Sequence, residues 1–143
     1  MRSGHRTLTG WLVTAALFLT LGCDRSGPPR VHVGAPCVSC GMSIRDTHFA
    51  CVRGSRGHYR QFDSIECLLR EGPARPGESI FLPDYDQAQL CLADTVWVVQ
   101  GSFPTPMGGG LAAFATEASA RDVGAQTNGR VGRWHEFVGR AKS

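Results

Sequence analysis

The chain has 143 residues, of which 42% are hydrophobic and 19% charged, and its formal net charge is +3. This length suits one domain with a modest core, and so small a positive excess excludes an electrostatic argument for a nucleic-acid partner. Six cysteines are the unusual part of the composition, because that number in a short chain indicates either disulfides or a metal site.

The first 22 residues have the order of a secretory signal. Basic residues precede an apolar run, residues 10–21, which is about half as long as a membrane-spanning helix requires. Cys23 follows this run directly, as in bacterial lipoprotein signals, although Thr20 stands where such signals usually have leucine. We expect residues 1–22 to be removed and Cys23 to carry the lipid. An ordinary signal peptide and an uncleaved anchor are the alternatives.

The segment after the signal, residues 23–36, is rich in glycine and proline and short of large apolar residues. This composition predicts a flexible tether between the lipid and a domain over residues 37–135, with a polar tail over residues 136–143. The signal contains two basic residues and no acidic one, so the rest of the chain has a net charge of +1.

The first half of the domain predicts the order strand, strand, helix, strand. Residues 48–52 and 58–62 have the composition of strands and are separated by a glycine-containing turn. Asp63 is expected to cap a helix that ends near Gly72. A short apolar run, residues 79–82, is expected to form the third strand.

The second half repeats this order. Residues 95–99 and 111–115 are predicted strands, Thr116 is expected to cap a helix that runs to Gln126, and residues 130–134 form a last strand or turn. The repeat lies in the order of the elements more than in residue identity. The sequence therefore predicts an α+β domain made of two similar strand-strand-helix-strand halves.

Sulfur is concentrated at the start of the domain, where Cys37, Cys40 and Met42 lie within six residues. Met107 lies in a second glycine- and proline-rich segment, residues 104–110. Two cysteines three residues apart can share a metal or close a small disulfide, and a methionine adds a soft, uncharged donor. We therefore predict that the two sulfur-bearing loops meet at one soft-metal site.

The methionines favour copper over zinc and over redox chemistry. Zinc sites take thiolate and imidazole, whereas Cu(I) accepts thiolate together with thioether. A redox Cys-x-x-Cys pair usually begins a helix, and no helix is predicted directly after Met42. His48 and His58 are possible nitrogen donors. The remaining cysteines are interpreted as ordinary core or disulfide cysteines: Cys51, Cys67 and Cys91.

Three segments in this order closely resemble the NosL family: residues 37–44, 62–67 and 105–110. The similarity covers roughly residues 36–124 and agrees with the lipoprotein-like start. Members of that family are copper-binding lipoproteins of the bacterial cell envelope, associated with supplying copper to nitrous oxide reductase. The family's fold resembles the treble-clef-like core of an organomercurial lyase.

The resemblance implies a Cu(I) chaperone with no catalytic turnover, anchored through lipid on Cys23 and facing the periplasm. It would receive copper from an upstream donor and pass it to a client enzyme, nitrous oxide reductase, by exchange of thiolate and thioether ligands. Val38 and Ser39 stand where family members often have histidine, so His48 and His58 stay open as imidazole ligands. The metal ligands that the resemblance implies are Cys37, Cys40, Met42 and Met107.

Three other functions are consistent with parts of the sequence. Cys37 and Cys40 could serve a thiol-disulfide oxidoreductase, or the cysteines could be disulfide staples in a structural lipoprotein. The fold analogy to organomercurial lyase suggests cleavage of a carbon–mercury bond, but the sequence identifies no acid partner for that chemistry.

Overall fold

The computed structural model describes residues 29–138. The expected signal, the lipid-bearing Cys23 and most of the expected tail lie outside these residues. Within residues 29–138, no helix has both the length and the apolar character needed to cross a bilayer.

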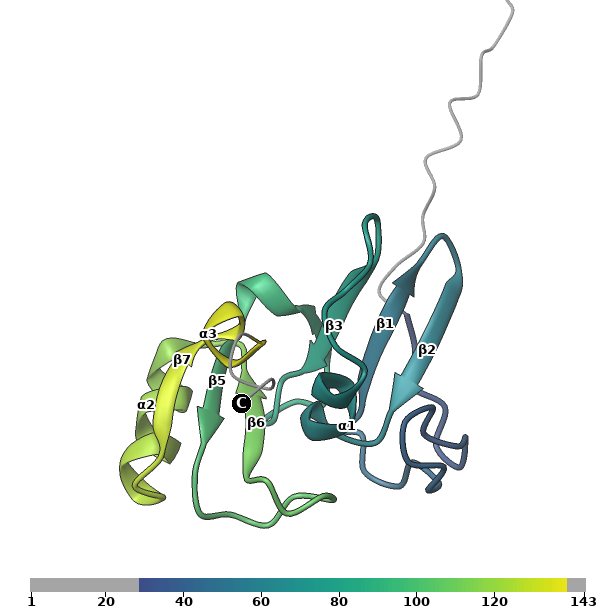
Figure 1. The fold of residues 1–143 in the computed structure, drawn as a ribbon. Helices are drawn as coiled ribbons and strands as arrows, with labels where there is room; N and C mark the ends of the chain where they lie inside the picture. The colour runs from purple at the N-terminus through teal and green to yellow at the C-terminus, as the bar shows by residue number, and fades with distance from the viewer. Residues whose placement is uncertain (1–28, 139–143) are drawn as a thin grey trace, which may run out of the picture.

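The first half of the described chain forms a four-stranded antiparallel sheet with one helix (Figure 1). Its sheet order is β2-β1-β3-β4, so the first strand lies between the second and the third. Arg56 and Gly57 join the first two strands with positive φ angles of 48° and 82°, which makes the hairpin tight. In chain order the elements are β1 (Cys51–Ser55), β2 (His58–Phe62), α1 (Ile65–Arg70), β3 (Ser79–Pro83) and β4 (Leu90–Leu92).

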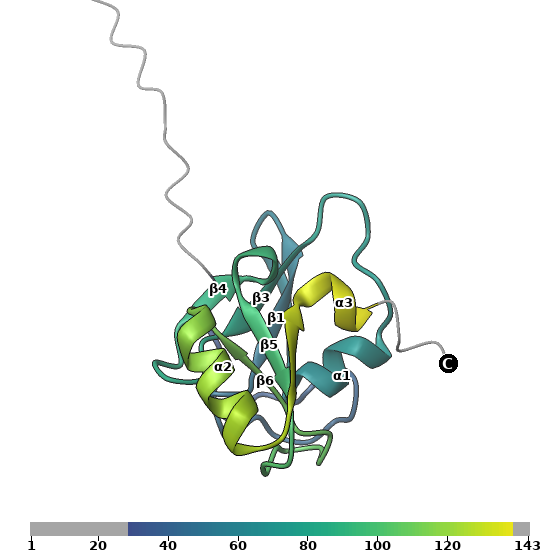
Figure 2. The same cartoon turned by 90° about the vertical axis from the view of Figure 1, so that its left-hand side faces the viewer.

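The second half forms a three-stranded antiparallel sheet in the order β6-β5-β7, again with its first strand in the middle. Figure 2 shows α2 on one side of this sheet and α1 and α3 on the other. The elements are η1 (Ala93–Thr95), β5 (Trp97–Gln100), β6 (Leu111–Phe114), α2 (Glu117–Gln126), β7 (Arg130–Arg133) and α3 (Trp134–Val138).

The predicted fold class is confirmed, because both halves have the order strand, strand, helix, strand in a mixed α+β fold. Three elements were not predicted, namely β4, η1 and α3. The first strand begins at Cys51 and not at His48, because residues 47–49 form a turn in which the amide of His48 donates to the Asp46 carboxylate at 2.9 Å.

One hydrophobic cluster joins the two halves. Phe62 and Leu82 from the first half pack with Val98 and Trp134 from the second, and all are buried. A smaller cluster around Phe114 lies under α2. Because the larger cluster draws on both sheets, we expect the halves to unfold together.

The packed chain begins before the expected domain start at Cys37. Val31 packs against the larger cluster, and the amide of His32 donates to the side chain of Gln61 at 2.6 Å. The amide of Gly34 donates to the carbonyl of Ile44 at 2.8 Å. These contacts hold the segment that leads into the cysteine-bearing hairpin.

Candidate metal centre

Cys37 and Cys40 lie in a tight hairpin before β1. The amide of Cys37 donates to the carbonyl of Met42, and the amide of Gly41 donates to the carbonyl of Cys37, both at 2.8 Å. Gly41 has a φ of 77°, a conformation that costs glycine little and lets the chain reverse directly after Cys40. The amide of the intervening Val38 donates to the carbonyl of Gln61 at 3.0 Å, which ties the hairpin to the end of β2.

Cys67 enters the same site from the first turn of α1. Ser64 caps this helix, and its hydroxyl accepts a hydrogen bond from the amide of Cys67 at 3.3 Å. Asp63, the expected cap, lies one residue earlier and is buried, so the expectation was wrong by one position. The shift matters because the cap fixes which residue of the first turn faces the hairpin.

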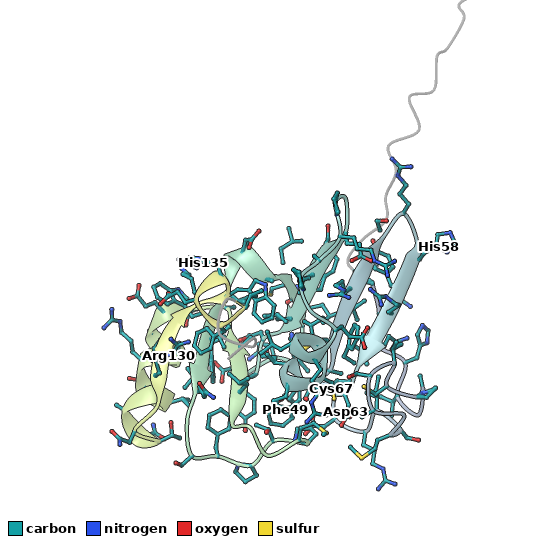
Figure 3. All side chains as sticks on the ribbon, viewed as in Figure 1. Phe49, His58, Asp63, Cys67, Arg130 and His135 are labelled. Carbon is teal, nitrogen blue, oxygen red and sulfur yellow. The ribbon has the colours of Figure 1, made fainter. Side chains whose placement is uncertain are left out.

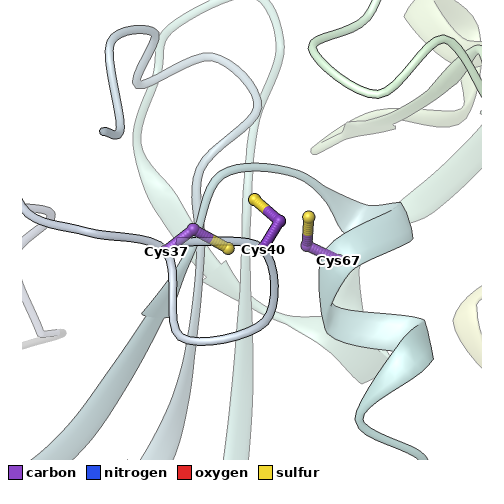
Figure 4. Close-up of side chains that lie close together, drawn as sticks. All are labelled: Cys37, Cys40 and Cys67. Carbon is purple, nitrogen blue, oxygen red and sulfur yellow. The ribbon is translucent and has the colours of Figure 1, made fainter. Parts of the chain in front are cut away.

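The three thiols form one cluster, shown in Figure 4. The sulfur atoms of Cys37, Cys40 and Cys67 all lie within 4.8 Å of one another. Two thiolates that bind one ion at about 2.3 Å cannot be more than about 4.6 Å apart, so small side-chain movements bring all three onto one metal. Cys37 and Cys67 are buried, with exposed fractions of 2% and 0%, and Cys40 is partly exposed. The cluster therefore opens to the surface on the Cys40 side.

The hairpin favours the thiolate form of Cys37. Burial raises the pKa of Cys37, but backbone amides that donate to its sulfur outweigh burial and leave the pKa below its ordinary value. These amides belong to Asp63, Cys40 and Ser39. The pKa of Cys37 is thus shifted in the direction that favours the thiolate, which is the form that binds metals.

The other buried thiols are held in the protonated form. Burial, together with the nearby thiols of Cys40 and Cys37, raises the pKa of Cys67 to about 12 against a lowering contribution from Ser64. Burial, with Glu66 and the neighbouring cysteines, also raises the pKa of Cys51 well above its ordinary value. The thiol of Cys51 donates to the carbonyl of Phe49 at 3.3 Å, so it is satisfied as a core residue.

The two methionines differ in their surroundings. Met107 is partly buried and packs against the hydrophobic cluster to which Cys37 and Cys67 belong. Met42 has an exposed fraction of 47%, although its backbone is part of the cysteine hairpin. Met107 therefore contacts the same hydrophobic core as the buried thiols, whereas the side chain of Met42 lies at the surface.

The two candidate histidines lie outside the thiol cluster: His48 pairs with Asp46, and His58 is far from the cysteines. The ring of His48 lies 2.9 Å from the Asp46 carboxylate, and both side chains are about half exposed. His58 begins β2 at the tip of the hairpin, whereas Cys67 lies beyond the other end of that strand (Figure 3). Neither ring belongs to the group formed by the three thiols.

Cys67 is the site residue that sequence reasoning missed. It was interpreted as a core or disulfide cysteine, and it is indeed buried, but its sulfur faces the two hairpin thiols. The five cysteines of the described residues are all free thiols. The available signal was its place three residues after a capping serine, in a segment that already resembled the NosL family.

The fold and the thiol cluster together define a small α+β domain with a candidate soft-metal centre. A solved structure with this fold is the copper chaperone NosL from Shewanella denitrificans. It matches with a TM-score of 0.65 and 18% sequence identity over 77% of this chain and 94% of that chain. No protein-family model matches the sequence, and no curated protein matches it at a significant level. The expected resemblance to NosL is thus confirmed at the level of the fold.

Proposed function

We propose that this protein is a Cu(I)-binding metallochaperone without catalytic turnover. The observation that carries the proposal is the meeting of three thiols from two separate segments, within 4.8 Å, in a fold shared with a copper chaperone. A soft monovalent cation is well matched to such a set, because Cu(I) is selected by thiolate and thioether ligands.

Copper is held in this proposal by Cys37 and Cys40 from the hairpin and by Cys67 from α1. Met107 and Met42 are weaker thioether donors that take the place of a thiol in this low-coordinate site and that a partner displaces first. The exposure of Met42 and the partial exposure of Cys40 support this direction of transfer, because an incoming ligand reaches the metal from that side. Protons leave the thiols as the metal binds, so copper affinity falls in acid.

The location and the partners follow from the NosL resemblance and from the start of the chain. We propose a periplasm-facing protein attached to a membrane by lipid on Cys23. An upstream copper donor loads it, and the client is a copper enzyme, with nitrous oxide reductase as the specific candidate. Pull-down of the client with the copper-loaded protein, but not with the metal-free protein, tests this assignment.

The central test is an anaerobic titration of the reduced protein with Cu(I) against a competing chelator, run beside Zn(II). Tight one-to-one binding of copper, in preference to zinc and weakened by loss of Cys67, supports the proposal. Failure to compete for copper, with Cys37 and Cys40 forming an exchangeable disulfide instead, would replace it with the thiol-disulfide function.

A further inference from the structure

The loop that carries Met107 is closed at its base. It joins β5 to β6, and the amide of Gly101 donates to the carbonyl of Gly110 at 2.9 Å across its two ends. Within the loop, the amide of Gly108 donates to the carbonyl of Thr105 at 3.0 Å. Met107 therefore sits on a compact turn, and the place of that turn depends on what holds it from outside.

Glu66 of α1 provides that contact. One of its carboxylate oxygens, Oε1, accepts a hydrogen bond from the Thr105 hydroxyl at 2.9 Å and from the amide of Leu111 at 3.5 Å. The same hydroxyl accepts from the amide of Gly110 at 3.1 Å. A single side chain thus fixes both the middle and the end of the loop, with a charged acceptor that makes these hydrogen bonds stronger than neutral ones.

The contact with Glu66 and the backbone conformation together account for the three glycines after Met107. A Cβ at Gly109 would lie 2.6 Å from Cγ of Glu66, so any larger residue would push the glutamate away. Gly108 and Gly110 have φ angles of 72° and 65°, which only glycine adopts at little cost. The loop is therefore built to lie directly against the Glu66 side chain.

Glu66 is also the neighbour of Cys67 in the first turn of α1. We propose that Glu66 is a positioning residue that fixes the Met107 loop relative to the Cys67 thiol, and so places the thioether at the copper site. This inference rests on the proposed copper function. It adds a residue that does not contact the metal but sets the distance between ligands from two halves of the chain.

Only one of the two carboxylate oxygens of Glu66 bonds to the loop. Oε2 of Glu66 is buried and has no hydrogen-bond partner among the described residues. The hydrogen bonds to the loop all use Oε1, which an amide oxygen can replace. Glu66→Gln is therefore expected to keep the loop in place, whereas Glu66→Ala removes the acceptor altogether.

The test is a double-mutant cycle on the reduced full-length protein, with Cu(I) affinity measured against a chelator. We expect Glu66→Ala to weaken copper binding about as much as Met107→Ala, roughly tenfold, and the double variant to be no weaker than either. Glu66→Gln should restore affinity to within about twofold of the wild type. Glu71→Ala is the matched control, because Glu71 ends the same helix and contacts Arg60 on the surface.

A metal-free measurement separates this inference from the copper function. Hydrogen exchange at the amides of Gly110 and Leu111 should accelerate in Glu66→Ala but not in Glu66→Gln or Glu71→Ala. Unchanged exchange, or additive losses of affinity in the cycle, would overturn the positioning role of Glu66. Tight Cu(I) binding by the wild-type protein in the same experiment would leave the chaperone function intact. If the wild-type protein failed to compete for Cu(I) but exchange still accelerated in Glu66→Ala, the copper function would be overturned. Glu66 would then only hold the Met107 loop in place.

Discussion

The two halves of this domain enter their helices through the same arrangement of strand end and capping residue, and they differ in the residues that follow the cap. Phe62 ends β2 and Ser64 caps α1, just as Phe114 ends β6 and Thr116 caps α2. Both caps accept from the amide three residues later, at 3.3 Å and 3.2 Å. The shared geometry therefore belongs to the scaffold.

The residues placed by the two caps are different. In the first half the sequence from the phenylalanine onward supplies a buried acid, a loop-binding glutamate and a thiol, and in the second half it supplies two alanines and a serine. The first set is Asp63, Glu66 and Cys67, and the second is Ala115, Ala118 and Ser119. The comparison teaches that the same capped-helix arrangement presents small side chains in one half and, in the other, a thiol that joins the cluster of Cys37 and Cys40.

The largest effect expected is on stability, and it should be equal in the two halves. Phe62→Ala and Phe114→Ala each remove a fully buried ring, so each should lower the free energy of unfolding by about 3–5 kcal/mol. Urea unfolding followed by circular dichroism measures this. Two separate transitions, or a loss in one half only, would show that the halves do not share one cooperative core.

The next effect concerns the thiol that the second half lacks. Cys67→Ser gives α1 the residue that α2 has at Ser119, and we expect Cu(I) affinity to fall about 100-fold, or about 2.7 kcal/mol, because one of three thiolates is lost. Chelator competition measures the change.

The control for this variant is Cys91→Ser, since Cys91 lies on β4 outside the thiol cluster and bonds only weakly to the carbonyl of Gln89. Cys67→Ala repeats the test without burying a hydroxyl. If copper affinity in both Cys67 variants equalled that of Cys91→Ser, Cys67 would be a packing residue and not a ligand.

A smaller effect is expected from the methionines, which compare the β5–β6 loop of the second half, where Met107 lies, with the cysteine hairpin before β1 in the first half, where Met42 lies. Met107→Leu should weaken Cu(I) binding about tenfold, or about 1.4 kcal/mol, because it keeps the packing and removes the sulfur. Met42→Leu should weaken binding less, since Met42 is half exposed. Equal affinities for wild type and both variants would leave the thiols as the whole site.

The smallest effect compares the two caps directly. Ser64→Ala and Thr116→Ala should each lower the free energy of unfolding by about 1 kcal/mol, because each removes the acceptor of a first-turn amide. Only Ser64→Ala should also weaken copper binding, since Ser64 lowers the pKa of Cys67 and its loss makes the thiolate harder to form. A parallel loss of affinity in Thr116→Ala would contradict a local role for Ser64.

The order of elements was predictable because it depends on local patterns. Alternating apolar residues, capping side chains and glycine turns indicate strands and helices within a few residues. The order of elements in both halves and the Thr116 cap were therefore predicted correctly. The concentration of sulfur-bearing residues in 37–42 was also visible in the sequence. The place of Cys67 was not, because it depends on the hydrogen bond from Val38 to Gln61, which joins segments far apart in the sequence.

The element α1 spans only Ile65–Arg70, and this shortness has a consequence for the order of events. Isolated helices below about 12–15 residues are marginal in water, so α1 forms only when the sheets pack around it. The thiol of Cys67 therefore meets Cys37 and Cys40 late, after the tertiary structure is complete. A nascent or unfolded chain keeps only Cys37 and Cys40 close together, because they are three residues apart. A metal bound by all three thiols can therefore be acquired only once the fold has brought Cys67 to the other two.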